Sequence, residues 1–158
     1  MARPSRELSV APGRILRCYA QPEAEALAAR WWEAFGAGGE IVSTRRFLWE
    51  VFSGGDFPSL RGGAALIEYA KQELSEYVVL SNDRSLAFAT DWRPESCSLY
   101  DYLVFPSNLE WTMAFTHEAG WLGPYFAFHR NARALHRENA GLLTKSRQSE
   151  AARRRGWQ

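Results

Sequence analysis

The chain has 158 residues, of which 46% are hydrophobic and 14% aromatic, so it is long and apolar enough for one packed domain. This composition excludes fibrous, collagen-like, coiled-coil and largely disordered proteins. The net charge of +1 conceals an uneven distribution, because residues 1–20 carry +3, residues 129–158 carry +6, and the stretch between them carries −8. The acidic middle disfavours contact with nucleic-acid phosphates and favours a cationic protein partner; a purely solubilising role of these acids is the alternative.

The first third of the chain predicts a loose segment followed by a helix. Residues 1–13 show no hydrophobic period and are expected to form a flexible arm, and residues 15–20 favour a short edge strand or a lead-in. Residues 22–35 form the clearest helix, because Pro22 suits the first turn and a glycine-rich stretch ends it. Its apolar stripe includes Trp31.

Two further helices are expected before the first long strand. Residues 43–52 fit either a helix or a strand, and we favour a short helix because Ser53, Gly54 and Gly55 would end it. Residues 57–61 are expected to form a loop. Residues 62–74 carry apolar side chains at helical spacing.

The hydrophobic period then changes from helical to extended. Turn signals separate five segments rich in strand-forming residues, at 76–80, 85–90, 99–105, 110–117 and 125–129. The first two are expected to pair as a hairpin. A final helix is predicted over 131–139, followed by a basic, disordered tail over 144–158.

This order of elements predicts an α+β fold with a single domain over residues 14–143. We expect a four- to five-stranded antiparallel meander, with the N-terminal helices and one C-terminal helix packed on one face. A turn centred near Trp121 would pair Met113 with His129 on the last two strands. In this register His117 and His129 lie roughly 13 Å apart, too far to share one metal ion, so no metal site is expected.

Several short motifs between residues 49 and 126 are shared with a known family. They are Trp49-Glu50-Val51-Phe52-Ser53, Asp101-Tyr102-Leu103-Val104, Glu110-Trp111-Thr112, Thr116-His117-Glu118 and Gly123-Pro124-Tyr125-Phe126. Together they resemble the small bacterial family called domain of unknown function 4275, over half to two-thirds of the chain. The family has no established activity, so the resemblance supports the fold unit and points to these residues without giving them roles.

Candidate functional side chains gather on the last three predicted strands. The residues that we expect to bind a partner or ligand are Asp101, Glu110, Thr112, Thr116, His117, Glu118 and Phe126. Structural hydrogen bonding of Asp101, Thr116, His117 and Glu118 is the alternative interpretation. The chain lacks the motifs of a serine-nucleophile turn or a phosphate-binding glycine loop, and we expect no catalytic residue and no cofactor.

These observations favour a non-enzymatic acidic binding protein that neutralises a cationic bacterial partner such as a toxin domain, by analogy with immunity proteins. Its expected contact acids are Asp91, Glu95, Asp101, Glu110 and Glu118. The alternative is a small enzyme or ligand-binding protein with a site around Asp101, Thr116, His117 and Glu118. Nucleic-acid binding through the basic tail is a third hypothesis, which we consider weaker than a solvated terminus.

Hydropathy and cysteine spacing predict where the protein is located and whether its thiols are reduced. No stretch approaches the roughly 18 apolar residues of a membrane helix, and the first residues lack the apolar run of a secretory signal. Cys18 and Cys97 match no metal-ligand spacing. We therefore expect reduced thiols and a cytoplasmic protein.

Overall fold

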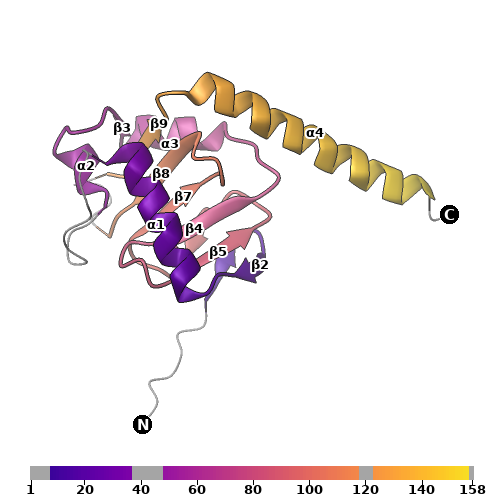
Figure 1. Ribbon diagram of the computed structural model, residues 1–158, viewed down its shortest axis with the longest axis horizontal. Helices are drawn as coiled ribbons and strands as arrows, with labels where there is room; N and C mark the ends of the chain where they lie inside the picture. Colours follow the sequence, from indigo (N-terminus) through magenta and orange to yellow (C-terminus); the bar gives the residue numbers. More distant parts are fainter. Residues whose placement is uncertain (1–7, 37–47, 118–122, 157–158) are drawn as a thin grey trace, which may run out of the picture.

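The computed structural model describes residues 8–36, 48–117 and 123–156, and it has an α+β architecture built on one large antiparallel sheet (Figure 1). The strands of this sheet are β2 (Ile15–Cys18), β3 (Leu60–Arg61), β4 (Tyr77–Ser81), β5 (Ala87–Thr90), β7 (Tyr102–Phe105), β8 (Trp111–Phe115) and β9 (Tyr125–Phe128). A separate ladder pairs β1 (Val10–Ala11) with β6 (Ser96–Cys97). The helices are α1 (Gln21–Phe35), α2 (Glu50–Ser53), α3 (Gly63–Ala70) and α4 (Ala132–Gly156).

The strands of the large sheet follow the order β2-β5-β4-β7-β8-β9-β3. The predicted α+β class, antiparallel pairing and first hairpin are confirmed. The predicted strand count is too low, because the short segments β2 and β3 extend the sheet at its two edges. The simple meander holds only for β7, β8 and β9, since the chain crosses past β4 between β5 and β7.

Helices cover both faces of the sheet, so the expectation that they pack on one face is wrong. We call the buried residues under α1 and α2 the first cluster; they include Trp31, Leu80 and Tyr125. The buried residues under α3 form the second cluster, which includes Tyr69 and Trp111. Alternate side chains of each central strand enter opposite clusters, which makes both faces apolar.

Helix α1 forms where the sequence predicts it, and its small residues let it approach the sheet. Pro22 lies in its first turn, and the backbone N–H of Gly36 bonds to the carbonyl of Trp32 at its end. Ala24 and Ala28 lie on the buried face with the two large rings of Trp31 and Phe35. Spacings of three and four residues therefore place one stripe against the first cluster.

The pairing of β8 with β9 differs from the predicted register. Met113 lies opposite Phe126 rather than His129, a shift of three residues. An odd shift exchanges the two faces of a strand. Phe126 therefore packs with Met113 in the second cluster, and Tyr125 belongs to the first.

Helix α4 is much longer than predicted and extends away from the sheet (Figure 1). Residues 144–156 are helical, where the sequence analysis expects a disordered tail. At the other end of the chain, β1 lies inside the segment expected to be a flexible arm. The helix expected over 43–52 falls partly outside the described residues, and α2 is its described end. Within the described ranges, no helix combines the length and the apolar character needed to cross a membrane.

Candidate functional site

Asp101 and His117 form a close pair at one end of the β7–β8 ladder. The pairing of Tyr102 with Phe115 places the residue before β7 beside the chain that leaves β8. The two carboxylate oxygens of Asp101 lie 2.9 and 2.8 Å from Nδ1 of His117, and one of them also accepts the backbone N–H of His117 at 3.0 Å. The side chain of Asp101 is 13% exposed and that of His117 is 40% exposed.

This arrangement is chemically specific. A carboxylate on Nδ1 holds the imidazole in one orientation, as the acid of an acid–base dyad does. Asp101 thus makes hydrogen bonds within the fold, and its partner is His117. Thr116, which directly precedes His117 in the chain, is buried. Glu118, the fourth member of the predicted site, lies outside the described residues.

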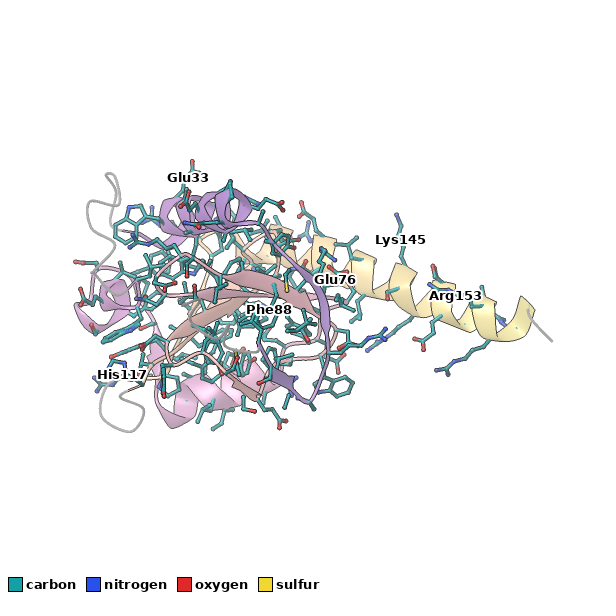
Figure 2. All side chains as sticks on the ribbon, turned by 90° about the horizontal axis from the view of Figure 1, so that it is seen from below. Glu33, Glu76, Phe88, His117, Lys145 and Arg153 are labelled. Carbon is teal, nitrogen blue, oxygen red and sulfur yellow. The ribbon has the colours of Figure 1, made fainter. Side chains whose placement is uncertain are left out.

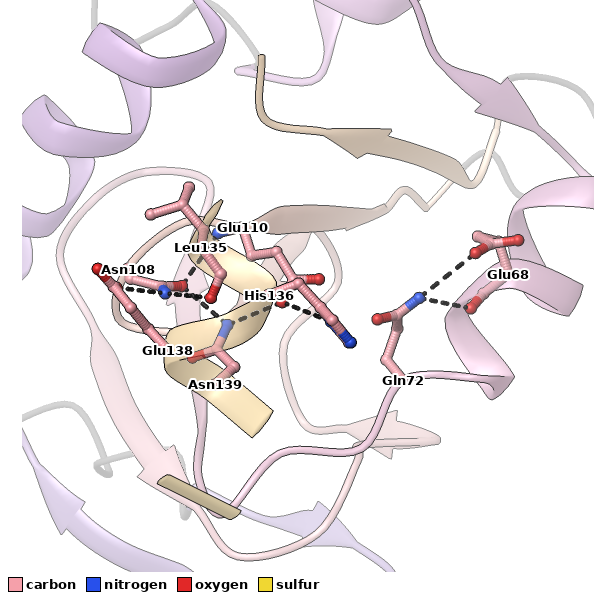
Figure 3. A network of polar contacts seen from close by, with 8 residues as sticks. All are labelled: Glu68, Gln72, Asn108, Glu110, Leu135, His136, Glu138 and Asn139. Carbon is pink, nitrogen blue, oxygen red and sulfur yellow. Dashed lines mark hydrogen bonds and ion pairs between the residues drawn. The ribbon is translucent and has the colours of Figure 1, made fainter. Parts of the chain in front are cut away.

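Glu110 lies at the opposite end of β8, in a buried polar network (Figure 3). One of its carboxylate oxygens, Oε1, accepts a hydrogen bond from Nδ2 of Asn139 at 2.9 Å and lies 3.3 Å from Nδ1 of His136. Asn108, in the turn before β8, donates to the carbonyl of Leu135 and accepts from Asn139. These contacts attach the first turns of α4 to the sheet, so Glu110 is a structural residue and not an exposed contact acid.

A groove of about 410 Å³ lies next to this network, between α3 and α4. Phe128 lines it and is 42% exposed. Glu68 and Gln72 approach from the side of α3, and His136 approaches from α4 (Figure 3). Both signs of charge line the groove, because Arg133 and Arg137 also border it.

Two predicted site residues belong to the core. Thr112 is fully buried, and its hydroxyl accepts the indole N–H of Trp31 at 2.8 Å. Phe126 is also fully buried and stacks on Trp111 in the second cluster. Their expected binding role is wrong, because helices on both faces of the sheet leave these side chains no access to a partner.

The six predicted site residues that the structure describes therefore do not form one site. Asp101, Thr116 and His117 come together at one end of β8, whereas Glu110 lies about seven residues away, roughly 23 Å along an extended strand. Among the residues that the structure describes, no group of three His, Cys, Asp or Glu side chains could hold a metal ion. Cys18 and Cys97 are free.

The expected contact acids also differ in their surroundings. Asp91 forms an ion pair with Arg14 at 3.3 Å, and Glu95 is exposed at the start of β6. Two further acids near this side of the sheet have arginine partners from the chain ends, since Arg17 lies 2.7 Å from Glu76 and Arg147 lies 3.1 Å from Glu73. The basic ends thus fold back and neutralise part of the acidic middle.

A different set of acids lies exposed on α1, spread over about 160° around the side that faces away from its buried stripe. We call Glu23, Glu25 and Glu33 the acidic face of α1; Glu33 points away from the sheet (Figure 2). Within the described ranges, none of them forms an ion pair with a basic side chain, and Arg30 on the same helix donates to the carbonyl of Ser107 instead.

Glu33 of the acidic face also lines a groove near the C-terminal end of α1. This groove has a volume of about 650 Å³, and its lining includes Glu33, Asp56, His129 and Arg130. The predicted contact acids do not include Glu33 or Asp56. The signal was available, since Glu33 lies opposite the buried Trp31 stripe on a helix that was correctly predicted.

No family model, no curated protein and no solved structure matches this chain. The resemblance to domain of unknown function 4275 therefore stays a prediction.

Proposed function

We propose that the protein is a non-enzymatic binding protein that holds a cationic protein partner against the acidic face of α1. The comparison with immunity proteins, which neutralise bacterial toxins, remains an analogy. The observation that carries the proposal is the contrast between two groups of acids. Glu73, Glu76 and Asp91 are paired with arginines of the same chain, whereas the three acids on α1 have no ion-pair partner among the described residues.

A partner of opposite charge can form ion pairs with surface charges that have no partner within the chain. Carboxylates on an exposed helix create a negative potential that speeds encounter with a cationic surface and selects against anionic ones. Glu33 continues this potential into the groove with Asp56, where a lysine or arginine side chain could insert. We propose a cytoplasmic location, with which the free thiols of Cys18 and Cys97 are consistent.

The experiment compares two variants that lose the same charge. Glu23→Gln/Glu25→Gln/Glu33→Gln neutralises the acidic face of α1, and Glu73→Gln/Glu76→Gln/Glu95→Gln removes three exposed acids elsewhere. Tagged wild-type protein retains a basic partner from its host at low salt; the partner is identified by mass spectrometry, purified, and titrated against each form by calorimetry. We expect the α1 variant to bind at least tenfold more weakly, and the other variant to bind within about threefold of wild type.

Affinity for this partner should also fall as KCl rises from 50 to 300 mM, because exposed charges are screened over about 10 Å at 0.1 M salt. Equal binding by the two variants, or a partner held with no dependence on salt, would refute the proposal. So would a partner that carries a net negative charge.

The Asp101–His117 pair favours a second candidate, a small enzyme or ligand-binding protein with its site around Asp101, Thr116, His117 and Glu118. The supporting observation is the orientation of the imidazole by both oxygens of Asp101. A thermal-shift screen of small anionic and polar compounds on wild type and His117→Gln tests it. A compound that stabilises wild type and not the variant supports this function, and a screen in which no compound separates the two proteins rejects it.

A further inference from the structure

Most of the surface of helix α4 is exposed to solvent. It has 25 residues and is therefore about 37 Å long. Asn139 is its one buried residue among those described, and the helix extends beyond the sheet in both views (Figures 1 and 2). Its sequence contains seven basic and two acidic side chains. A helix with so little packed surface is not explained by the stability of the core.

Four arginines lie along one side of this helix. At 100° per residue, Arg133, Arg137, Arg147 and Arg155 fall within about 80° of one another, and we call them the basic face of α4. All four are exposed. They extend over 22 residues, about 33 Å along the axis. Glu138 and Glu150 fall outside this face.

The residues between these arginines are small or polar. Ala140, Thr144 and Ala151 lie on the same side of the helix, so the backbone can approach a flat or grooved partner closely. A helix that lies on a membrane needs large apolar side chains beside its basic ones, and a protein-binding helix is usually anchored by aromatic side chains. The basic face of α4 has neither. Its line of charges instead matches a linear polyanion.

We propose that the basic face of α4 binds the phosphate backbone of a nucleic-acid duplex. A DNA duplex carries one negative charge for about every 1.7 Å of its axis, and its major groove admits an α-helix. The planar guanidinium of arginine donates two parallel hydrogen bonds to a phosphate. The straight helix presents four such groups without any change in the fold.

Two features of the molecule leave the basic face of α4 accessible to a phosphate backbone. Arg147 pairs with Glu73, but both side chains are more than 60% exposed, and an exposed pair of this kind contributes little and can exchange for a phosphate. Arg155 lies eight residues further, about 12 Å along the helix. This exceeds the screening length of about 10 Å at 0.1 M salt, so the acids of the globular part repel a duplex there only weakly.

The test uses two variants that each remove two positive charges from α4. Arg137→Gln/Arg155→Gln changes the basic face, and Lys145→Gln/Arg153→Gln changes other sides of the helix (Figure 2 labels Lys145 and Arg153). Binding of the full chain to a fluorescein-labelled 20-base-pair DNA duplex, and to an RNA duplex of the same sequence, is followed by fluorescence anisotropy. Circular dichroism checks that each variant keeps its helix content.

We expect wild type to bind with a logarithmic salt slope of about −3.6 for four phosphate contacts, which is roughly a hundredfold loss of affinity between 50 and 200 mM KCl. The basic-face variant should bind at least tenfold more weakly and with about half this slope, and the other variant within about threefold of wild type. Binding to one duplex and not the other identifies the nucleic acid. Tight binding to both fits recognition of the backbone.

Three outcomes would overturn the proposal. They are no binding at 50 mM KCl, equal losses in both variants, or a loss of binding when the acidic face of α1 is neutralised, which would indicate association between copies of the chain. Because the α1 variant changes a separate helix, failure here leaves the proposed function untouched.

Discussion

A buried hydrogen bond joins α1 to the sheet at the first cluster. The indole N–H of Trp31 has the hydroxyl of Thr112 as its partner, and the same hydroxyl donates to the carbonyl of Val104. Thr112→Val preserves the shape but leaves the buried indole without an acceptor. We expect a loss of about 1–3 kcal/mol in the free energy of unfolding, measured by urea denaturation. Thr144→Val, on the exposed part of α4, should change it by no more than about 0.5 kcal/mol; a similar loss in both variants would contradict this account.

His129 should make stability depend on pH. Its Nδ1 accepts the backbone N–H of Asn131 at 2.9 Å just before α4, and burial together with the charge of Arg130 lowers its pKa. The folded chain then binds this proton less tightly than the unfolded chain, so stability falls as pH drops through about 6.5 and levels off below the folded pKa. Urea midpoints measured at pH 7.5, 6.5 and 5.5 should fall less steeply for His129→Gln. Parallel curves for the two proteins would exclude this residue as the cause.

Single residues also show where the sequence is informative about the site. The acid at position 101 stands out between the aromatic and apolar residues of the predicted strand, and the structure pairs it with His117. Thr112 was misassigned because a hydroxyl in a strand usually indicates the solvent side. Its burial depends on Trp31, 81 residues away, and no local pattern reveals that contact.

At the scale of elements, α3 is preceded by a glycine that no other residue can readily replace. Gly62 adopts φ +65° and ψ −131°, and its N–H donates to the carbonyl of Pro124 beside β9. An added Cβ would meet no atom within 4 Å at either Gly62 or Gly63, so the two positions differ only in backbone conformation. We expect Gly62→Ala to lose about 1–3 kcal/mol of unfolding free energy, and Gly63→Ala to be neutral or slightly stabilising. Equal effects in thermal unfolding would show that the backbone conformation is unimportant.

Element type was easier to predict than pairing. Helix α1 and strands β4, β5, β7, β8 and β9 each carry a local signal of period or turn chemistry. The register of β8 on β9 does not, because α3 covers one face and α1 the other, so both sets of alternate side chains are apolar. When a strand is buried on both faces, its hydrophobic pattern does not distinguish one register from a register shifted by one residue. The prediction of Met113 opposite His129 failed for this reason.

At the scale of the whole molecule, the fold brings part of the basic chain ends against the acidic middle. Arginines from both chain ends meet acids at one side of the sheet, through Arg14, Arg17 and Arg147. The acidic face of α1 and the distal part of α4 are left as separate surfaces of opposite sign. The charge sum over residues 21–128 describes an acidic middle stretch, but it does not indicate which acids remain available to a partner.

The two clusters share one sheet, and the molecule should therefore unfold as one unit. Leu80 of β4 is fully buried in the first cluster and Met113 of β8 in the second. Leu80→Ala and Met113→Ala should each lose about 2–5 kcal/mol of unfolding free energy. Because alternate residues of the same strands enter both clusters, either loss must weaken the other face as well. We expect each variant to show a single transition, with the same urea midpoint by tryptophan fluorescence and by circular dichroism. Separate midpoints in either variant would mean that the helices of one face can detach while the opposite cluster stays folded.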